Sequence, residues 1–450
     1  MNPVNKGFGF LFEMGCGKTL TAISVMGVGW QQGRIKRVLV VAPTSVCSVW
    51  PKDMQEAAAF PFHASILLGT KEKRIKALDD LEAFPFKALK VAVINYESVW
   101  RDGLLDKLMQ WDPDLIIADE SQRIKSPKAE QSKAMHQLGD KARYKLILSG
   151  TPVQNNALDL YSQYRFMDKS IFGTNYYAFR GRYAIMGGFD NKQVVGYKDM
   201  EDLIRKEYSA AYRVTKAEAL DLPEQTFLTR YVQLSPKDRK LYDRIKKESF
   251  AELVNGETVT ATTVLTRLLR LQQFAGGFIQ TDDGEKPEFA HDAKLKALED
   301  ILDDYVLDAG KKLVVFARFR PELTLIEQLL RKKKIRYGLI YGDIPLSERG
   351  GIVKDFQENP QTRVFLAQID TAGLGITLTA ADTCVYYSVN FNYAAYSQSL
   401  ARIHRIGQRN TCTYIHLITE KTVDEKIMRA LQKKEDLAKA VVDNWREMFE

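Results

Sequence analysis

Two segments that lie far apart in the chain carry side chains that could handle one polyphosphate. The first is residues 13–19 (EMGCGKT), which follow the apolar run 8–12. The second is residues 398–408 (QSLARIHRIGQ), where arginines and amides occur without any aspartate or glutamate. A triphosphate held by the first segment and touched by the second would turn the gap between two lobes into a nucleotide-operated hinge.

The first segment has the composition of a phosphate-binding loop. Glycines allow backbone N–H groups to converge on phosphate oxygens, and a helix that follows adds the partial positive charge of its N-terminus. Lys18 would reach the β- and γ-phosphates, and the Thr19 hydroxyl would bind Mg²⁺. Phe12 occupies the first glycine position of the strict G-x-x-x-x-G-K-T pattern, so the loop alone could be a chance match. The residues predicted to bind the nucleotide here are Met14, Gly15, Cys16, Gly17, Lys18 and Thr19.

Two further apolar runs end in residues that suit the same chemistry. Residues 114–120 (DLIIADE) predict a buried strand that places Asp119 near a metal ion and Glu120 where it can orient and deprotonate water. An exposed Asp-Glu pair at a strand end is the alternative, and the upstream glycine loop disfavours it. The next run is followed by residues 149–152 (SGTP), whose hydroxyl groups could sense a γ-phosphate, touch a nucleic-acid backbone or only cap a turn.

Arg402 and Arg405 are three residues apart, which places them on one helical face. Guanidinium groups match phosphate in a bidentate geometry, and an arginine finger can raise a hydrolysis rate by ~10³ to 10⁵. A salt-bridged surface helix is the alternative, but residues 398–408 supply no acidic partners for it. We therefore predict that both arginines stabilise transition-state charge.

The bulk composition is that of a multidomain protein with a basic surface. The chain has 450 residues, of which 45% are hydrophobic, so two or three packed domains are expected. The net charge of +8 favours a polyanionic partner, since Lys and Arg contacts to phosphate supply most non-specific affinity for nucleic acid. Four scattered cysteines without a C-x-x-C pair predict reduced thiols and no structural zinc. The sequence shows neither a membrane span nor the layout of a secretory signal.

Short apolar runs alternate with segments of helical period, and this pattern occurs twice. Strands that are apolar on both faces and separated by helices predict parallel sheets covered on both sides, hence an α/β fold with two lobes. The predicted strands are 38–42, 91–94, 115–118 and 146–148 in the first half, and 313–317, 364–367, 385–388 and 414–418 in the second.

The stretch between these two sets of strands is rich in Tyr, Phe and Arg and mostly helical in period, for example over 237–253 and 262–274. The polar segment 281–292 is typical of a connector. The predicted organisation is a first lobe over 1–156, a helical insertion and linker over 157–290, and a second lobe with a C-terminal helix over 291–450.

Seven motifs occur in order along the chain: MGCGKT, VVAPTSVCSVW, INYE, DESQRIKS, LSGTPVQNN, TAGLGITLTAA and QSLARIHRIGQ. This set resembles the Swi/Snf-type ATPases of helicase superfamily two. HRIGQ at 404–408, RIK at 123–125 and QNN at 154–156 are specific to that group rather than to helicases generally. The resemblance covers nearly the whole chain, whose compact length looks most like bacterial or bacteriophage members.

The resemblance implies two RecA-like lobes that bind ATP and Mg²⁺, and that move along double-stranded DNA on its backbone, usually without separating the strands. It also implies a location in the cytoplasm, or in the nucleus of a eukaryote, and we expect a monomer. The catalytic residues carried over by position are Lys18, Glu120, Arg402 and Arg405, and the metal ligands are Thr19 and Asp119. Gln398 and Gly375 would join the nucleotide site. The DNA path would be lined by Thr44, Ser45, Gly150, Thr151, Thr371, Ala372 and Gly373.

Some positions depart from the family pattern. Gln122 stands where a histidine usually follows the acidic pair, and Ala401 stands where an aspartate usually precedes Arg402. Cys16 replaces a common leucine, and the helix N-terminus would favour its thiolate. The adenine-reading glutamine segment that is usual upstream of the phosphate loop does not fit before residue 13, so either the sequence is truncated or adenine is read weakly.

Two other functions stay open beside a translocase. A helicase that unwinds duplexes or structured RNA would need an apolar or aromatic wedge, for which 176–183 is the candidate. A DNA-binding clamp that keeps the fold but no longer cycles fits the changes at Gln122 and Ala401. The favoured hypothesis is a DNA-stimulated ATPase that translocates on duplex DNA with little sequence preference.

Overall fold

The computed structural model describes residues 7–101, 103–188, 193–254, 261–279, 287–374 and 376–438. The described chain divides into two compact units. Unit 1 comprises the described parts of Met1–Asp221 and Lys434–Glu450, and unit 2 comprises those of Leu222–Lys433. No described helix combines the length and the apolar character that crossing a bilayer requires.

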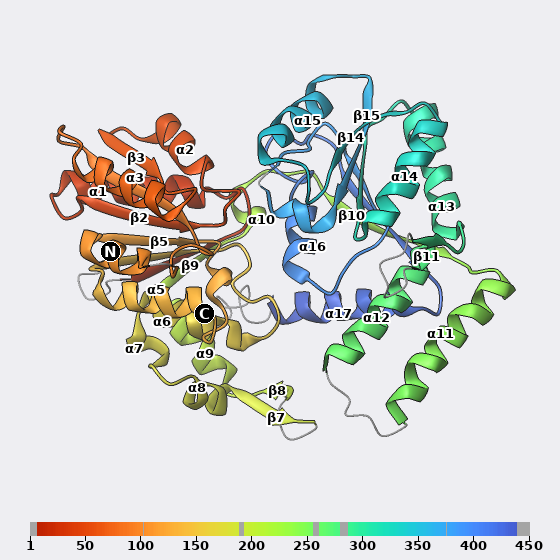
Figure 1. Cartoon of the computed structure of the whole chain (residues 1–450), viewed down its shortest axis with the longest axis horizontal. Helices are drawn as coiled ribbons and strands as arrows, with labels where there is room; N and C mark the ends of the chain where they lie inside the picture. Colours follow the sequence, from red (N-terminus) through yellow and green to blue (C-terminus); the bar gives the residue numbers. More distant parts are fainter. Residues whose placement is uncertain are drawn as a thin grey trace. The chain divides into compact units, whose positions relative to one another are not determined.

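Unit 1 is built on a parallel sheet in which the described strands follow the order β3-β4-β2-β5-β6-β1-β9 (Figure 1). Most of these strands are apolar on both faces, as expected for a parallel sheet that helices cover on both sides. The strands are β1 (Gly7–Phe12), β2 (Arg37–Ala42), β3 (Phe62–Ile66), β4 (Leu89–Asn95), β5 (Leu115–Asp119), β6 (Tyr144–Leu148) and β9 (Ala211–Val214).

Helices of unit 1 bury the two faces of this sheet in separate cores. On one face, α1 and α2 pack against Val38 and Val40 of β2, and on the other, α3 to α6 pack against Leu39 and Val41. The helices are α1 (Lys18–Gln31), α2 (Val49–Ala57), α3 (Lys71–Glu82), α4 (Leu104–Trp111), α5 (Glu130–Lys141), α6 (Leu160–Met167), α7 (Lys169–Phe172), α8 (Tyr176–Tyr183), α9 (Met200–Tyr208) and α10 (Lys216–Ala219). A hairpin of β7 (Ala184–Gly187) and β8 (Gln193–Tyr197) follows α8.

Unit 2 repeats the architecture with a parallel sheet whose described strands follow the order β10-β17-β16-β13-β15-β14 (Figure 1). Its strands are β10 (Gln225–Val232), β13 (Leu313–Ala317), β14 (Arg336–Ile340), β15 (Thr362–Gln368), β16 (Thr383–Tyr386) and β17 (Cys412–Thr419), with a separate ribbon of β11 (Phe278–Ile279) and β12 (Glu288–Phe289). Its helices are α11 (Pro236–Val254), α12 (Ala261–Ala275), α13 (Ala293–Ile301), α14 (Arg320–Lys332), α15 (Leu346–Glu358) and α16 (Tyr393–Leu400). The last helix, α17 (Val423–Ala438), begins in unit 2, and its residues from Lys434 on are counted with unit 1.

The predicted α/β class with two parallel-sheet lobes is confirmed. All eight predicted strands are present as β2, β4, β5, β6, β13, β15, β16 and β17, and the predicted helices over 237–253 and 262–274 correspond to α11 and α12. The stretch 157–290 also contains two strands that were not predicted. β9 is an edge strand of the sheet in unit 1, and β10 is an edge strand of the sheet in unit 2. Edge strands were missed because half-polar segments such as Ala211–Val214 lack the continuous apolar run of a central strand. The boundaries at 156 and 290 remain predictions.

Candidate nucleotide site

The phosphate loop joins β1 to α1 and has the backbone of an anion-binding turn. Gly15 and Gly17 adopt φ of +89° and +84°, a left-handed conformation that side chains other than glycine disfavour. Gly17 immediately precedes α1, so the unpaired N–H groups of that helix begin at Lys18. Phe12, at the position of the missing glycine, is the last residue of β1 and packs its ring against Phe10, with centroids 5.4 Å apart. The turn therefore begins after Phe12 and keeps the two glycines that shape it.

Lys18 lies inside the curve of this loop. Its ammonium donates to the carbonyl oxygens of Phe12 at 2.9 Å and of Glu13 at 3.2 Å. Gly150, at the end of β6, lies so close that a Cβ built there would be 3.5 Å from Lys18 Nζ and 3.3 Å from the Phe12 oxygen. The structure thus brings Gly150, which the sequence assigned to the DNA path, against the phosphate loop.

The thiol of Cys16 does not show the activation expected from the helix N-terminus. Burial, together with the negative charge of Glu13, raises the pKa of Cys16 above its ordinary value, while Lys18 opposes the shift only in part. The neutral thiol is favoured, so the expectation of a stabilised thiolate was wrong.

Asp119 is a buried carboxylate at the end of β5. Its Oδ2 accepts from the indole N–H of Trp50 at 2.9 Å, and its Oδ1 accepts from the backbone N–H of Glu120 at 3.0 Å. Burial, followed by repulsion from Glu120, raises the pKa of Asp119 to about 6, and Lys18 acts in the opposite direction. A divalent cation would offset both unfavourable effects, so the residue fits the role of a metal ligand.

Mg²⁺ is usually held by one or two carboxylates together with substrate phosphates rather than by an all-protein cage. Among the described residues, no group of three or more His, Cys, Asp or Glu side chains is placed to hold a metal ion. Asp119 and the hydroxyl of Thr19, at the start of α1, remain the predicted ligands for Mg²⁺ that arrives with a nucleotide. Trp50, which orients Asp119, had no predicted role, although it ends the motif VVAPTSVCSVW.

Glu120 is connected to the segment after β6 through the side chain of Gln122. The amide nitrogen of Gln122 donates to Glu120 Oε2 at 2.5 Å, and the hydroxyl of Ser149 donates to the amide oxygen of Gln122 at 2.7 Å. The backbone N–H of Thr151 donates to Ser149 Oγ at 3.1 Å. An amide can donate and accept at once, so Gln122 makes a continuous link at the position where the family usually has histidine.

Thr44 and Ser45 follow β2 at the same edge of the sheet, because the carboxyl ends of parallel strands meet there. The Thr44 hydroxyl accepts from Asn95 Nδ2 at 3.0 Å and donates to Glu97 at 3.4 Å. Thr44 is exposed and Ser45 is half-buried. The geometry leaves both accessible on unit 1, and their role on a DNA path remains a prediction.

In unit 2, Arg402 and Arg405 converge on one backbone group. Each Nη1 donates to the carbonyl oxygen of Ile376, at 3.4 Å for Arg402 and 3.3 Å for Arg405. Arg402 is 1% exposed, whereas Arg405 is half-buried and burial lowers its pKa. Gln398 is half-buried on α16.

The helical segment predicted for the two arginines was wrong, although their guanidinium groups do lie together. α16 ends at Leu400, whose carbonyl accepts from the hydroxyl of Tyr414. The backbone N–H of Arg402 then donates to the carbonyl oxygen of Ser399, three residues earlier, which makes the turn tighter than in an α-helix. Further on, Gly407 bends the chain with φ of +97°.

The segment after β15 carries the other predicted DNA contacts. Thr371 is buried in the 3₁₀ turn Ile369–Leu374, and its hydroxyl donates to the Gln368 carbonyl at 2.5 Å. Ala372 and Gly373 belong to the same turn, and Gly375 lies outside the described residues. These assignments remain predictions.

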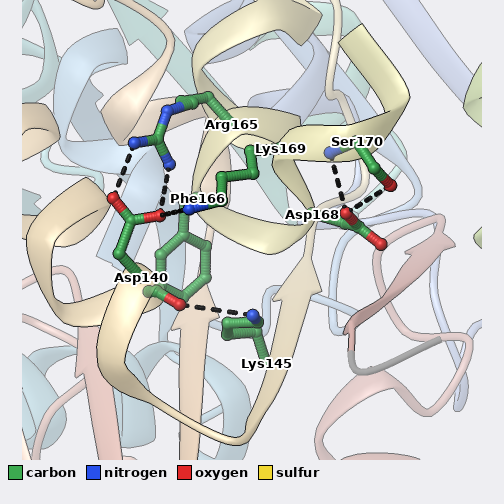
Figure 2. A pocket seen from close by; sticks show the side chains of 8 residues that line it. Asp140, Lys145, Arg165, Phe166, Asp168, Lys169 and Ser170 are labelled. Carbon is green, nitrogen blue, oxygen red and sulfur yellow. Dashed lines mark hydrogen bonds and ion pairs between the residues drawn. The ribbon is translucent and has the colours of Figure 1, made fainter. Parts of the chain in front are cut away.

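A pocket outside the motif set lies between α5, β6 and α6 in unit 1 (Figure 2). Its walls carry opposite charges that are paired with each other. Arg165 makes a two-pronged contact to Asp140 at 2.9 and 2.6 Å, and Lys169 bonds to the same carboxylate at 3.3 Å. Arg165 and Lys169 are thus engaged by one carboxylate, while the Lys145 ammonium donates to the Gly139 carbonyl at 3.2 Å.

Two family models agree with the motif assignment. The chain matches the family model described as SNF2-related domain over residues 6–276, and the model described as helicase conserved C-terminal domain over residues 293–407. A solved structure, the Sulfolobus solfataricus SWI2/SNF2 ATPase core in complex with dsDNA, aligns at 25% identity with a TM-score of 0.43, covering 98% of this chain and 90% of that one.

Several longer proteins are similar in sequence. An uncharacterized ATP-dependent helicase of Mycoplasma genitalium is 26% identical over 95% of this chain and 39% of its own length. Human TATA-binding protein-associated factor 172 is 28% identical over 96% of this chain and 26% of its own length. The ISWI chromatin-remodeling complex ATPase ISW1 of Saccharomyces cerevisiae is 27% identical over 94% of this chain and 37% of its own length. The chain spans less than half the length of each of these relatives.

Proposed function

We propose that this chain, which belongs to the SNF2-related domain family, hydrolyses ATP and uses the energy to translocate along double-stranded DNA. The match to a helicase C-terminal domain and the similarity to proteins named ATP-dependent helicases support the use of ATP. The observation that carries the proposal is the link from Glu120 through Gln122 and Ser149 to Thr151. It connects the carboxylate suited to water activation with a segment suited to sensing a phosphate or a DNA backbone.

Each unit contributes a distinct part of the proposed chemistry. The phosphate loop binds the nucleotide through backbone N–H groups, and the Lys18 ammonium moves from loop carbonyls to the β- and γ-phosphates. Asp119 and Thr19 would hold Mg²⁺, which would neutralise charge on the phosphates. Glu120 orients water and accepts its proton. Arg402 and Arg405 would stabilise the charge that develops on the γ-phosphate.

DNA is expected to be held mainly through its backbone. Thr44, Ser45 and Thr151 would contact phosphates from unit 1, and residues 371–373 would do so from unit 2. Backbone contacts position a protein without reading sequence, so binding should show little sequence preference and a steep dependence on salt. The net charge of +8 suits this mode. We expect a monomer to be sufficient.

The structure disfavours the wedge that a strand-separating helicase would need. In α8, Phe179 and Tyr183 are buried, and the ring of Tyr176 packs at 5.3 Å from that of Tyr161. Tyr177, 60% exposed, is the one strongly exposed aromatic residue of this helix, with Arg180 against its face. These aromatic residues mainly build the core of unit 1.

The second alternative, a DNA-binding clamp that no longer cycles, is disfavoured because the Gln122 side chain keeps a hydrogen-bonded path from Ser149 to Glu120.

Phosphate release by the purified chain tests the proposal. It should be measured without nucleic acid and with duplex DNA, single-stranded DNA and RNA. We expect duplex DNA to stimulate release most, and a triplex-displacement assay to show movement without strand separation. Equal rates under all four conditions would exclude a DNA-driven motor, and displacement of a strand from a forked duplex would favour the helicase.

A further inference from the structure

The edge strand β9, which was not predicted, places the buried side chain of Arg213 beside the start of the phosphate loop. β9 pairs in parallel with β1, so that Leu11 lies beside Arg213, and the Glu13 N–H donates to the Val214 carbonyl at 2.9 Å. Arg213 is 5% exposed. The phosphate loop is thus flanked by a strand located about two hundred residues further along the chain.

Arg213 connects β1, the start of the phosphate loop and the segment that follows β6. Its Nη1 donates to the carbonyl oxygens of Leu11 at 2.8 Å and of Gly150 at 3.1 Å. Its Nη2 pairs with Glu13 Oε1 at 3.2 Å. A planar guanidinium with five N–H donors can serve these acceptors together, whereas a lysine ammonium is a single point charge.

The carboxylate of Glu13 is held from both sides. Oε1 receives Arg213, and Oε2 accepts from the backbone N–H of Lys216 at 2.8 Å. On the other side of the same residue, the Glu13 carbonyl receives Lys18. The contacts of Arg213 and Lys216 therefore hold Glu13 in place. To reach a phosphate, the Lys18 ammonium would have to break its hydrogen bond to the Glu13 carbonyl.

We propose that Arg213 is a positioning residue of the nucleotide site, which holds Glu13 and Gly150 so that the phosphate loop keeps its binding conformation. The inference rests on the proposed function in one respect, namely that the loop binds a nucleoside triphosphate. Arg213 does not reach the reacting atoms itself. Its effect passes through the Glu13 carboxylate and the Gly150 carbonyl, so removing it loosens the loop and weakens nucleotide binding.

The test compares the wild-type chain with Arg213→Lys, Glu13→Gln and the double variant. Arg165→Lys is the control, because Arg165 also pairs with a carboxylate of the same unit, Asp140, and belongs to none of the motifs. The measurements are KM and kcat for DNA-stimulated ATP hydrolysis, the Kd of a fluorescent ATP analogue without DNA, and the melting temperature. Glu13 is one-third exposed, so Glu13→Gln provides a second variant should Arg213→Lys not fold.

We expect Arg213→Lys and Glu13→Gln each to raise KM and the analogue's Kd about tenfold, since each loses a charge-assisted hydrogen bond. The double variant should be little worse than Arg213→Lys alone, because the contact that Glu13→Gln weakens is already lost in that variant. Arg165→Lys should bind the analogue like the wild type. A lower kcat with unchanged KM and Kd in both single variants would mark a merely structural role and overturn the proposal.

The two proposals can fail separately. Should the wild type bind the analogue but show no DNA-stimulated hydrolysis, the proposed function falls, and the comparison of Kd values still decides the role of Arg213. Should hydrolysis be stimulated while Glu13→Gln and Arg213→Lys keep the wild-type Kd, the positioning role falls alone.

Discussion

Ser149 and Gln122 are joined by a hydrogen bond of 2.7 Å in which the buried serine hydroxyl donates to the amide oxygen. The nitrogen of the same amide is bonded to Glu120. One side chain therefore connects the end of β6 with the carboxylate at the end of β5. A histidine in this place would need its neutral form to donate at one nitrogen and accept at the other, whereas glutamine does both at any pH.

Gln122→Ala should reduce the stimulation of ATP hydrolysis by duplex DNA about tenfold, because both hydrogen bonds of the link are lost. The measurement is the ratio of kcat with and without DNA. Gln122→His should recover part of this ratio near pH 8, where the imidazole is neutral. An unchanged ratio in Gln122→Ala would show that stimulation reaches Glu120 by another route.

Gly150→Ala should raise KM for ATP several-fold through crowding alone. The new Cβ would lie 3.3 Å from the Phe12 oxygen and 3.4 Å from Met14 N, so the phosphate loop would have to shift by a few tenths of an ångström. Gly181→Ala is the control, since a Cβ there meets nothing within 4 Å and alanine favours the helix by about 1 kcal/mol. Equal KM values for the two variants would contradict the tight contact of Gly150 with the loop.

The two arginines of unit 2 should respond differently to removal. Arg405→Ala should lower DNA-stimulated kcat at least a hundredfold, as expected for an arginine finger, with little change in melting temperature. Arg402→Ala should lower the melting temperature as well, because its 1% exposed side chain would leave a cavity. Kinetics and thermal unfolding of both variants check this difference. Full activity of Arg405→Ala would remove it from the mechanism.

Lys18→Ala should abolish hydrolysis while the chain stays folded. Among the described residues, the Lys18 ammonium donates to the carbonyls of Phe12 and Glu13, so the substitution removes two local hydrogen bonds. Circular dichroism should match the wild type, and phosphate release should fall to background. Residual DNA-stimulated release would place the phosphates elsewhere.

The sequence predicted the central strands and the loop residues because continuous apolar runs and clustered glycines are local signals. It missed Arg213 and Trp50, whose partners Glu13 and Asp119 lie far away along the chain. It also placed Arg402 and Arg405 on a helix, because a spacing of three does not reveal that Tyr414 binds the Leu400 carbonyl and helps end that helix. Contacts that depend on strand order require the fold.

Glu322 is a fully buried carboxyl at the start of α14. Its Oε2 accepts from the backbone N–H groups of Arg318 at 3.1 Å and Phe319 at 3.0 Å, and from the hydroxyl of Ser388. Burial raises the pKa of Glu322 to about 7, although the bond from Ser388 and the charge of Lys294 oppose the shift. The native state therefore holds the proton over a pH range in which the unfolded chain has released it.

Because the folded pKa is raised, the stability from Glu322 is fully present below its ordinary pKa of 4.5 and is lost as the pH rises through about 7. The shift corresponds to about 3 kcal/mol. Glu322→Gln keeps the shape and removes the titration, so its unfolding free energy relative to wild type should rise by roughly this amount between pH 4.5 and pH 8. Denaturant unfolding at several pH values measures the difference. Glu358→Gln, an exposed residue of α15, is the control and should show no such trend. Parallel pH profiles for wild type and Glu322→Gln would mean that the buried carboxyl does not take up a proton in this range.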